Sequence, residues 1–379
     1  MLDLVGQYRR LQSEIDAAMD SVLERGDFIQ GSSVTLFEQE LADYLSVPYV
    51  ISCGNGTDAL QLAFMALDLP AGSEVILPSF AYAALAEVIL LLGLSPVFVE
   101  VNPSTYLIQE SAIQAAITNK TRVIAPVHLF GCMANMDAIL DIAHRHNLYV
   151  VEDAAQAIGS YYSGVSVRGF AGTLGTVGTT SFFPSKNLGC FGDGGAVFCS
   201  NLELATRIRQ LANHGQSTKY IHDIVGINSR LDTLQAAVLR VKLAHLEDFH
   251  AKRLTIAQRY VDGLQPLQDQ GLLQLPCFSG INSQHSELKS THVFHQFTLR
   301  IIAHEKRDTF RQFMSDRGIA TMVYYPLPLH RQNAYFQEVA LPMTEELCSQ
   351  VVSLPICPEL RVEAQQEIIL NVEEFFQKP

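Results

Sequence analysis

Short apolar runs alternate with longer amphipathic segments between about residue 49 and residue 153. The apolar runs are rich in valine and isoleucine and read YVISC, EVILPS, PVFVEV, RVIAPVHL and LYVVED. Between them, segments such as DALQLAFMAL and NMDAILDIAHRH repeat apolar residues at helical spacing. Because nearly continuous apolar strands between helices are typical of a parallel sheet buried on both faces, the pattern predicts an α/β fold. Ligands of such folds bind beyond the carboxyl ends of the strands.

The pattern changes after about residue 200. A helix is predicted over LELATRIRQLANHG, and a long helical pattern extends from Leu231 to about Leu264. The last quarter of the chain alternates in the order strand, helix, strand, helix, over HVFHQFTLRII, KRDTFRQFMSDRG, IATMVYY and QQEIILNVEEFFQ. Such an order predicts a small α+β unit.

A linker is indicated by Pro266, Pro276 and the polar segment SGINSQHSELKS. We therefore expect a large α/β domain over residues 1–265, with a helical segment at its N-terminal end. A small C-terminal α+β domain is expected over residues 266–379.

The composition argues against several classes of partner. The 379 residues carry a formal net charge of -13, whereas nucleic acids and anionic membranes are bound by basic faces. The apolar run Leu85–Leu94 contains Glu87 and is too short to span a membrane, and the N-terminal residues are charged where a signal peptide is apolar. The seven cysteines include no C-x-x-C pair that would indicate a zinc site. We expect a cytoplasmic protein that binds no nucleic acid, membrane or metal.

The loop SCGNGTDAL follows the first predicted strand and opens a helix. The backbone N–H groups of Gly56, Thr57 and Asp58 and the helix dipole are suited to binding a phosphate. Ordinary capping by Asn55 or Thr57 is the alternative interpretation. The loop matches neither the dinucleotide fingerprint nor the P-loop, which disfavours a Rossmann dehydrogenase and a Walker ATPase.

Lys186 lies in TTSFFPSKNLGCFGDGGAVF, between an apparent buried strand and a glycine-rich turn. A lysine is ordinarily a solvated surface charge. An amine on a rigid turn above a sheet, partly removed from water, has a lowered pKa and can form a Schiff base. The glycines leave room for a bulky cofactor to approach the backbone.

Two further residues follow predicted strands. Asp153 ends the run LYVVED, where its charge would favour a protonated heterocyclic nitrogen, although Asp153 and Gln156 also resemble a capping box. Tyr82 could stack on a ring, and its alternative is a half-buried aromatic at a strand end. Pyridoxal phosphate (PLP) requires a lysine for its aldehyde, an acid for its pyridinium nitrogen and an anion site for its phosphate. These needs match Lys186, Asp153 and the segment Gly56–Asp58.

Six motifs in series carry a family resemblance. They are SCGNGTDALQLAFMAL, EVILPSFAYAA, PVHLFG, VVEDAAQAIGS, SFFPSKNLGCFGDGGAVF and VGINSRLDTLQAAVL. Together they resemble the DegT/DnrJ-type nucleotide-sugar aminotransferases over nearly the whole chain. The resemblance implies the aspartate-aminotransferase-like fold, PLP fold type I.

The resemblance also implies roles for residues of the cofactor site. Lys186 would bind the cofactor aldehyde and move protons, and Asp153 would bind the pyridinium nitrogen. Gln156 would lie near the ring hydroxyl and Tyr82 against the ring. The phosphate would be held by the backbone of Gly56, Thr57 and Asp58 and by the hydroxyl of Ser181.

Further residues match positions around the substrate in this family. Asn228 matches a residue that reaches the partner's phosphate, which implies a homodimer with shared active sites. Arg230 matches a residue of the nucleotide-sugar pocket, although it could equally form a structural ion pair. The loop YYPLPLH, with Tyr324, Tyr325 and His330, matches the same pocket. His214 matches a loop beside the site, and its alternative is a histidine that contacts the terminal carbonyls of a helix.

The implied reaction moves an amino group from an amino acid, with glutamate the expected donor, to a nucleotide-linked keto-sugar. The motifs are most similar to enzymes that aminate C3 of a UDP-linked 2-acetamido-3-keto-hexuronic acid for O-antigen synthesis. Many relatives have His-Tyr-Pro where this chain has Tyr324, Tyr325 and Pro326. The alternatives are amination at C3 or C4 of another dTDP-, GDP- or UDP-linked keto-6-deoxysugar, and a regulator without catalysis. A sugar dehydratase is disfavoured because those relatives replace the lysine with histidine.

Overall fold

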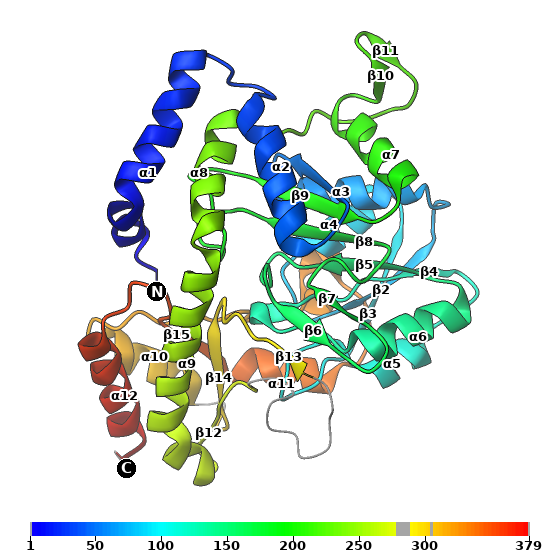
Figure 1. Cartoon of the computed structure of the whole chain (residues 1–379). Helices are drawn as coiled ribbons and strands as arrows, with labels where there is room; N and C mark the ends of the chain where they lie inside the picture. The colour runs from blue at the N-terminus through cyan, green and yellow to red at the C-terminus, as the bar shows by residue number, and fades with distance from the viewer. Residues whose placement is uncertain (1, 278–288, 304–305, 378–379) are drawn as a thin grey trace.

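A seven-stranded sheet lies at the centre of the part of the chain that the structure describes (Figure 1). This computed structural model describes residues 2–277, 289–303 and 306–377. In spatial order, the strands of the sheet are β1 (Tyr49–Cys53), β9 (Gly195–Cys199), β8 (Val177–Ser181), β5 (Tyr149–Asp153), β4 (Thr121–Ile124), β2 (Glu74–Pro78) and β3 (Ser95–Val99). Within this sheet, β9 is antiparallel to both neighbours and the remaining pairs are parallel. The predicted α/β fold with a mostly parallel sheet is confirmed.

Helices cover both faces of the sheet. Those of the first part of the chain are α1 (Leu4–Arg25), α2 (Ser32–Leu45), α3 (Gly56–Leu67), α4 (Ala84–Leu91), α5 (Glu110–Ala116), α6 (Met136–His146), α7 (Leu202–Ala212) and α8 (Thr233–Ala244). Val197 and Cys199 of β9 belong to a core cluster with α3 and α7, whereas Ala196 and Phe198 belong to a second cluster with α2 and α8. Successive side chains of a strand point to opposite faces, so β9 is buried on both. No helix among the described residues is long and apolar enough to cross a membrane.

Three helices begin at asparagines that follow strands or loops. Asn55, Asn135 and Asn201 accept, through their side chains, a backbone N–H of the first turn of α3, α6 and α7. An asparagine in this position satisfies one of the donors that a helix start leaves free. The sequence therefore determines where these helices begin, and α3 begins next to the predicted anion site.

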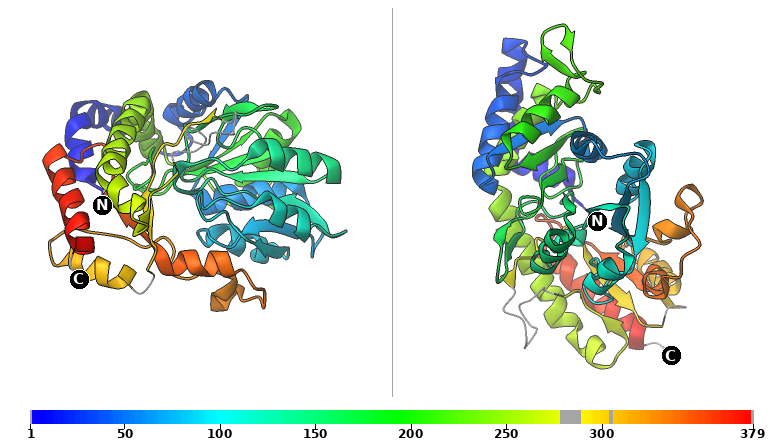
Figure 2. Two further views of the ribbon diagram at one scale, coloured as in Figure 1. Left: turned by 90° about the horizontal axis from the view of Figure 1, so that it is seen from below. Right: turned by 90° about the vertical axis from the view of Figure 1, so that its right-hand side faces the viewer.

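A third core cluster lies in the C-terminal part of the chain. Its elements are α9 (Leu246–Asp269), β12 (Leu273–Gln274), β14 (Phe297–Ile301), α10 (Arg307–Ser315), β15 (Val351–Leu354) and α12 (Val362–Gln377). Helix α11 (Pro342–Gln350) precedes β15, but its Leu347 and Cys348 belong to the same cluster as α3 and α7. The strands form a three-stranded antiparallel sheet in the order β12-β14-β15. In Figures 1 and 2, α12 lies beside α9 and α1 lies beside α8, along the same edge of the molecule.

Short elements complete the described part of the chain. The strands are β6 (Tyr161–Ser163), β7 (Arg168–Phe170), β10 (Gln216–Thr218), β11 (Ile221–His222) and β13 (Lys289–Ser290), and the 3-10 helices are η1 (Leu129–Gly131), η3 (Leu329–Arg331) and η4 (Asn333–Tyr335). β13, β6 and β7 form one small sheet, and β10 and β11 form a hairpin that extends from the end of α7 (Figure 1).

The C-terminal half differs from the sequence prediction in three places. The predicted long helix is two helices, because His245 departs from helical geometry between α8 and α9. Pro266 lies inside α9, where Leu264 and Leu267 on either side are buried in the third cluster, so no linker begins there. The predicted strand IATMVYY forms only an isolated bridge between Met322 and Ser353. Of the predicted polar linker, residues 279–288 lie outside the described residues.

Candidate active site

The predicted cofactor residues come from the ends of neighbouring strands and from the start of α3. Asp153 is the last residue of β5 and Ser181 the last of β8, and the two strands pair in parallel with Asp153 opposite Thr179. Gly56 is the first residue of α3, and a Cβ there would lie 2.7 Å from Cβ of Ser181. A side chain at position 56 would therefore force the start of α3 away from the end of β8.

The start of α3 is both capped and open to an anion. Asn55 Oδ1 accepts the N–H of Asp58 at 2.8 Å, and Asp58 Oδ2 accepts the hydroxyl of Ser229 at 2.6 Å. Within the described residues, the N–H groups of Gly56 and Thr57 have no hydrogen-bond acceptor. Both interpretations of this loop therefore apply, to different N–H groups. Ser229, which the sequence did not single out, also accepts the N–H of Gly54 at 2.9 Å.

Asp153 carries a half-buried carboxyl group at the carboxyl end of β5. Burial raises its pKa, and this effect is opposed by the N–H of Ala155, which donates to Oδ1 at 3.0 Å, and by the charge of Lys186. A cation placed beside Asp153 would favour the ionised carboxylate further. The geometry suits an acid that pairs with a positively charged ring nitrogen.

The capping-box interpretation of Asp153 is wrong. No helix begins at this point of the described chain, and the backbone N–H of Asp153 donates to Pro126 O at 3.0 Å instead of to a side chain. The side chain of Gln156 turns elsewhere: Oε1 accepts the N–H of Phe130 at 2.8 Å and Nε2 donates to the hydroxyl of Tyr325 at 3.2 Å.

Lys186 lies in the turn after β8 and interacts electrostatically with Asp153. Its side chain is half-buried, and burial lowers its pKa while the charge of Asp153 opposes that shift. The backbone N–H of Lys186 donates to Phe183 O at 2.8 Å, which closes the turn. The interpretation as a freely solvated surface charge does not describe this amine.

Asn187 fixes the turn directly after the lysine. Its Nδ2 donates to Val293 O at 3.0 Å, and its Oδ1 lies 3.1 Å from Nδ1 of His295. Because Oδ1 can only accept, Nδ1 of His295 carries the proton. Burial, together with the charges of Lys186 and Arg253, keeps the pKa of His295 well below its ordinary value. Sequence reasoning missed this pair, and a polar residue beside the lysine in an apolar stretch was the available signal.

Three tyrosines, Tyr82, Tyr324 and Tyr325, lie close together near these groups. Tyr82 is 64% exposed, so the alternative of a half-buried aromatic is wrong, and its ring lies 6.4 Å from the ring of Tyr325. Burial raises the pKa of Tyr325, which keeps its hydroxyl protonated as it accepts the hydrogen bond from Gln156. Tyr324 is half-buried next to it, and burial raises its pKa as well.

The remaining predicted residues, His214, Asn228 and Arg230, lie between α7 and α8 and are exposed or half-buried. Arg230 is half-buried and lines an open cavity of about 470 Å³ together with Glu38 and Arg209. Asn228 and His214 are exposed, and within the described residues the ring of His214 makes no hydrogen bond. Ser229 lies between this cavity and the anion site. It lines the cavity, and its hydroxyl donates to Asp58 at the anion site.

His330 is an internal anchor. Its ring is fully buried, with Nδ1 2.7 Å from Ser79 Oγ and Nε2 3.1 Å from Glu345 Oε1. Both nitrogens are therefore occupied inside the protein, and the ring has none left for a substrate. His330 attaches the loop that carries Tyr324 and Tyr325 to the end of β2.

A partly desolvated lysine beside a strand-end aspartate, with an open helix start nearby, provides the lysine, the acid and the anion site that PLP requires. The chain belongs to the DegT/DnrJ/EryC1/StrS aminotransferase family, whose model matches residues 9–373. The resemblance inferred from six sequence motifs is thereby confirmed. The protein is an enzyme, a PLP-dependent aminotransferase.

Curated relatives cover nearly the whole chain and have different functions. UDP-2-acetamido-2-deoxy-3-oxo-D-glucuronate aminotransferase from Pseudomonas aeruginosa is 44% identical, over 95% of each chain. A pleiotropic regulatory protein from Geobacillus stearothermophilus is 43% identical, over 99% of this chain and 98% of the relative. dTDP-3-amino-3,4,6-trideoxy-alpha-D-glucose transaminase from Streptomyces venezuelae is 40% identical, over 100% and 96%.

Solved structures agree with the fold. A DegT DnrJ EryC1 StrS aminotransferase from Brucella abortus superimposes with a TM-score of 0.91 at 38% identity, covering 100% of this chain and 99% of that one. The protein ntda from Bacillus subtilis, solved with bound cofactor pmp, gives a TM-score of 0.88 at 34% identity, covering 97% and 82%.

Proposed function

We propose that this enzyme transfers an amino group from glutamate to a nucleotide-linked keto-sugar, with Lys186 as its catalytic residue. The observation that carries the proposal is the position of Lys186, a partly desolvated amine beside Asp153 and one turn away from the end of β8. The donor leaves as its 2-oxo acid and the sugar carbonyl becomes an amine, so the two halves balance.

The residues present fit PLP. The free N–H groups of Gly56 and Thr57 and the hydroxyl of Ser181 would hold its phosphate, with Asp58 keeping Ser229 in place beside them. Asp153 would face the pyridine nitrogen, Tyr82 would pack on the ring, and Gln156 would lie near the ring hydroxyl. When bound, PLP supplies an electron sink for the transfer.

Lys186 would move the proton in each half of the reaction. In the first half its amine accepts the proton from Cα of the donor, and in the second it delivers a proton to the sugar carbon that gains nitrogen. The lowered pKa makes the neutral amine more accessible than it is for a solvated lysine. The negative charge of Asp153 lies in the same site and limits this lowering of the pKa of Lys186.

The favoured substrate is a UDP-linked 2-acetamido-3-keto-hexuronic acid, aminated at C3 for a surface polysaccharide such as O-antigen. The Pseudomonas aeruginosa relative, whose name specifies such a substrate, supports this choice. Arg230, which lines a cavity next to the anion site, suits the uronate carboxylate. Tyr325, whose ring lies 6.4 Å from that of Tyr82, and Tyr324 would contact the sugar. A dTDP-linked keto-6-deoxysugar is the second candidate, because the Streptomyces venezuelae relative is named for a dTDP-sugar.

The substrate is tested with a panel of keto-sugar nucleotides and glutamate. We expect formation of 2-oxoglutarate and of a 3-amino-uronate nucleotide, identified by mass and by NMR of the sugar ring. Amination of dTDP-keto-6-deoxysugars alone would assign the second candidate. Binding of PLP without turnover of any member of the panel would instead favour a regulator, the role named for the Geobacillus relative.

We further propose a cytoplasmic homodimer in which Asn228 completes the phosphate site of the partner. Asn228 is exposed directly beside Ser229, and the neighbouring hairpin and the loop after it expose Tyr220 and Val225, at 79% and 88%. Large exposed apolar side chains in one place are typical of an interface. His214 lies on the same exposed segment and would approach the shared site.

Subunit mixing tests the shared site. The variants Lys186→Ala and Asn228→Asp are each expected to be inactive, the second because an added carboxylate would repel the phosphate. In a mixed dimer, one of the two sites has both native residues. Because random mixing of equal amounts makes about half of the dimers mixed, it should restore about a quarter of the wild-type activity. Complete absence of recovery in verified mixed dimers would contradict the shared arrangement.

A further inference from the structure

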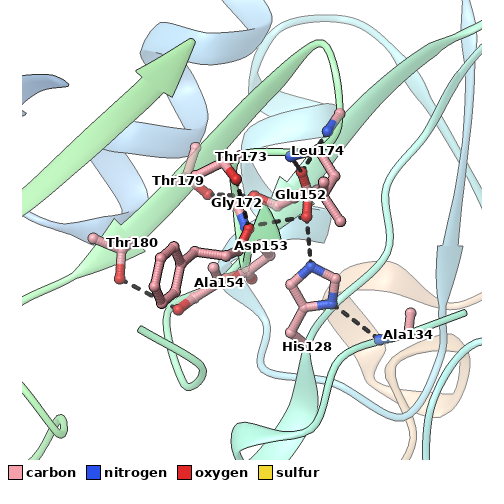
Figure 3. A network of polar contacts seen from close by, with 12 residues as sticks. His128, Ala134, Glu152, Asp153, Ala154, Gly172, Thr173, Leu174, Thr179 and Thr180 are labelled. Atoms are coloured by element: carbon pink, nitrogen blue, oxygen red, sulfur yellow. Dashed lines mark hydrogen bonds and ion pairs between the residues drawn. The ribbon is translucent and has the colours of Figure 1, made fainter. Parts of the chain in front are cut away.

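Glu152, the residue directly before Asp153, is a buried carboxylate that lies against His128 (Figure 3). Both side chains are 0% exposed, and Oε2 of Glu152 is 2.8 Å from Nε2 of His128. The other donors to the carboxylate are the backbone N–H groups of Gly172 (3.0 Å), Leu174 (2.7 Å) and Gly175 (2.5 Å). Four donors to one buried carboxylate satisfy its capacity almost completely.

The hydrogen bonds determine the protonation of this pair. Nδ1 of His128 accepts the N–H of Ala134 at 3.2 Å, so Nδ1 carries no proton. The proton is therefore on Nε2, which donates it to Glu152. The pair is a neutral imidazole and an ionised carboxylate, whose charge is balanced by backbone N–H groups.

The same residues hold the backbone of Asp153. The N–H of His128 donates to Asp153 O at 2.9 Å, and the N–H of Asp153 donates to Pro126 O at 3.0 Å. Thr179 Oγ1 donates to Glu152 O at 3.2 Å. These bonds join the end of β5 to β8, to the segment after β4 and to the loop before β8. The dashed lines of Figure 3 show the bonds that Glu152 makes with His128 and with this loop.

We propose that Glu152 and His128 are positioning residues for Asp153, whose carboxylate they hold at a fixed place and angle for the pyridine nitrogen of the cofactor. The proposal rests on the proposed role of Asp153. At the end of a strand the ladder of backbone hydrogen bonds stops, so side-chain bonds decide the direction of the next residues. Partners of this kind orient the groups that contact a ligand. Their loss therefore changes function although they do not contact the ligand themselves.

The variant Glu152→Gln tests the proposal in the PLP-loaded enzyme. A glutamine keeps the size of the side chain but presents one oxygen and one NH₂ group, so it cannot accept from all four donors. We expect the visible absorbance maximum and the ¹⁵N shift of the ring nitrogen of labelled PLP to move toward the values of Asp153→Asn. For metal sites, loss of such partners lowers activity by about 10- to 100-fold, and we expect a fall in kcat of that order.

Glu100→Gln is the matched control. Glu100 also accepts two backbone N–H groups, from Met343 and Thr344, and the hydroxyl of Thr344, at the end of the edge strand β3. The control should lose comparable stability but leave the spectrum and the ¹⁵N shift unchanged. Equal spectra for wild type, Glu152→Gln and Glu100→Gln would overturn the proposal.

A double variant separates this proposal from the proposed function. In the Asp153→Asn background, Glu152→Gln should cause little further loss of kcat, because the residue it positions is already changed. If Asp153→Asn alone leaves the ¹⁵N shift unchanged, the role of Asp153 itself is wrong. If Glu152→Gln does not fold, His128→Leu removes one donor and leaves the three backbone donors, and the same shift in spectrum is expected. An unshifted spectrum in folded His128→Leu would equally overturn the proposal.

Discussion

Asp153 and Lys186 belong to the same site, but the chain holds them in different ways. The bonds around Asp153 come from the sheet itself: His128 and Glu152 are 24 positions apart in sequence. The turn of Lys186 depends on distant segments: Asn187 and His295 are 108 positions apart, and Lys242 Nζ donates to Gly189 O at 2.7 Å across 53 positions.

Because their supports differ, Asp153 and Lys186 can be displaced independently of each other. The strand end at Asp153 is complete as soon as β4, β5 and β8 pair, because its partners lie on those strands and the loops beside them. The turn at Lys186 is complete only when α8 and the segment at 293–295 dock on it. Substitutions in the C-terminal third of the chain should therefore affect the reaction by displacing Lys186, whereas Asp153 should keep its position.

The largest expected effect is that of Lys186→Ala. General acid–base catalysis contributes about 10²- to 10⁴-fold, so we expect transamination to fall by about 1000-fold or more. The visible absorbance of the bound cofactor should change as well, because the amine that binds its aldehyde is gone. Lys252→Ala, which removes an exposed lysine of α9, is the control. An active variant with the wild-type spectrum would refute the assignment of Lys186.

Asn187→Ala should break the turn while leaving the strand end intact. It leaves Val293 O and Nδ1–H of His295 without their partners in a buried place, and each such group costs about 1–3 kcal/mol. We expect the free energy of unfolding to fall by about 3 kcal/mol, measured by urea denaturation. Asn371→Ala, which removes an exposed donor to Glu367 O, should have almost no effect. If both variants lose equal stability, the turn does not depend on Asn187.

The ¹⁵N shift of the PLP ring nitrogen distinguishes the support of Asp153 from that of Lys186. In Asn187→Ala the ¹⁵N shift of the PLP ring nitrogen should stay at its wild-type value, because Asp153 is held by Glu152 and His128 instead. In Glu152→Gln that shift should move. If Asn187→Ala moved the ring-nitrogen shift as far as Glu152→Gln does, the two supports would not be separate.

The sequence predicted those parts of the molecule that depend on local pattern. Apolar runs and helical spacing identified the strands of the central sheet and the helices between them, and the motifs around Lys186, Asp153 and Gly56 pointed to PLP. Each of these features is contained within some twenty residues. Asparagine caps such as Asn55 belong to the same class, because a cap acts within one helical turn.

The sequence could not predict the contacts that join distant segments. Nothing near His330 in the sequence indicates that its ring is buried between Ser79 and Glu345, and the family resemblance alone places it among the substrate residues. His245 lies in an unbroken helical pattern, yet it separates α8 from α9. Ser229 and His295 likewise acquire their partners only through the fold, as polar side chains placed against segments more than a hundred residues away.

The smallest expected effect is a change of stability with pH that comes from Lys242. Lys242 is 1% exposed, and its ammonium donates to Gly189 O and lies 4.7 Å from the ring centre of Phe191. Burial lowers the pKa of Lys242 to about 8 from the ordinary value of 10.5. Between these two pH values the unfolded chain binds more protons than the folded one, so this residue makes the free energy of unfolding rise with pH.

Relative to Lys242→Met, the wild type should gain about 2 kcal/mol in free energy of unfolding between pH 8 and pH 10, measured by urea denaturation. Lys252→Met, which removes an exposed ammonium, is the control. A wild type that loses stability relative to Lys242→Met over this range would show that the ammonium of Lys242 is favoured in the folded state, and that it strengthens the turn of Lys186 through its charge.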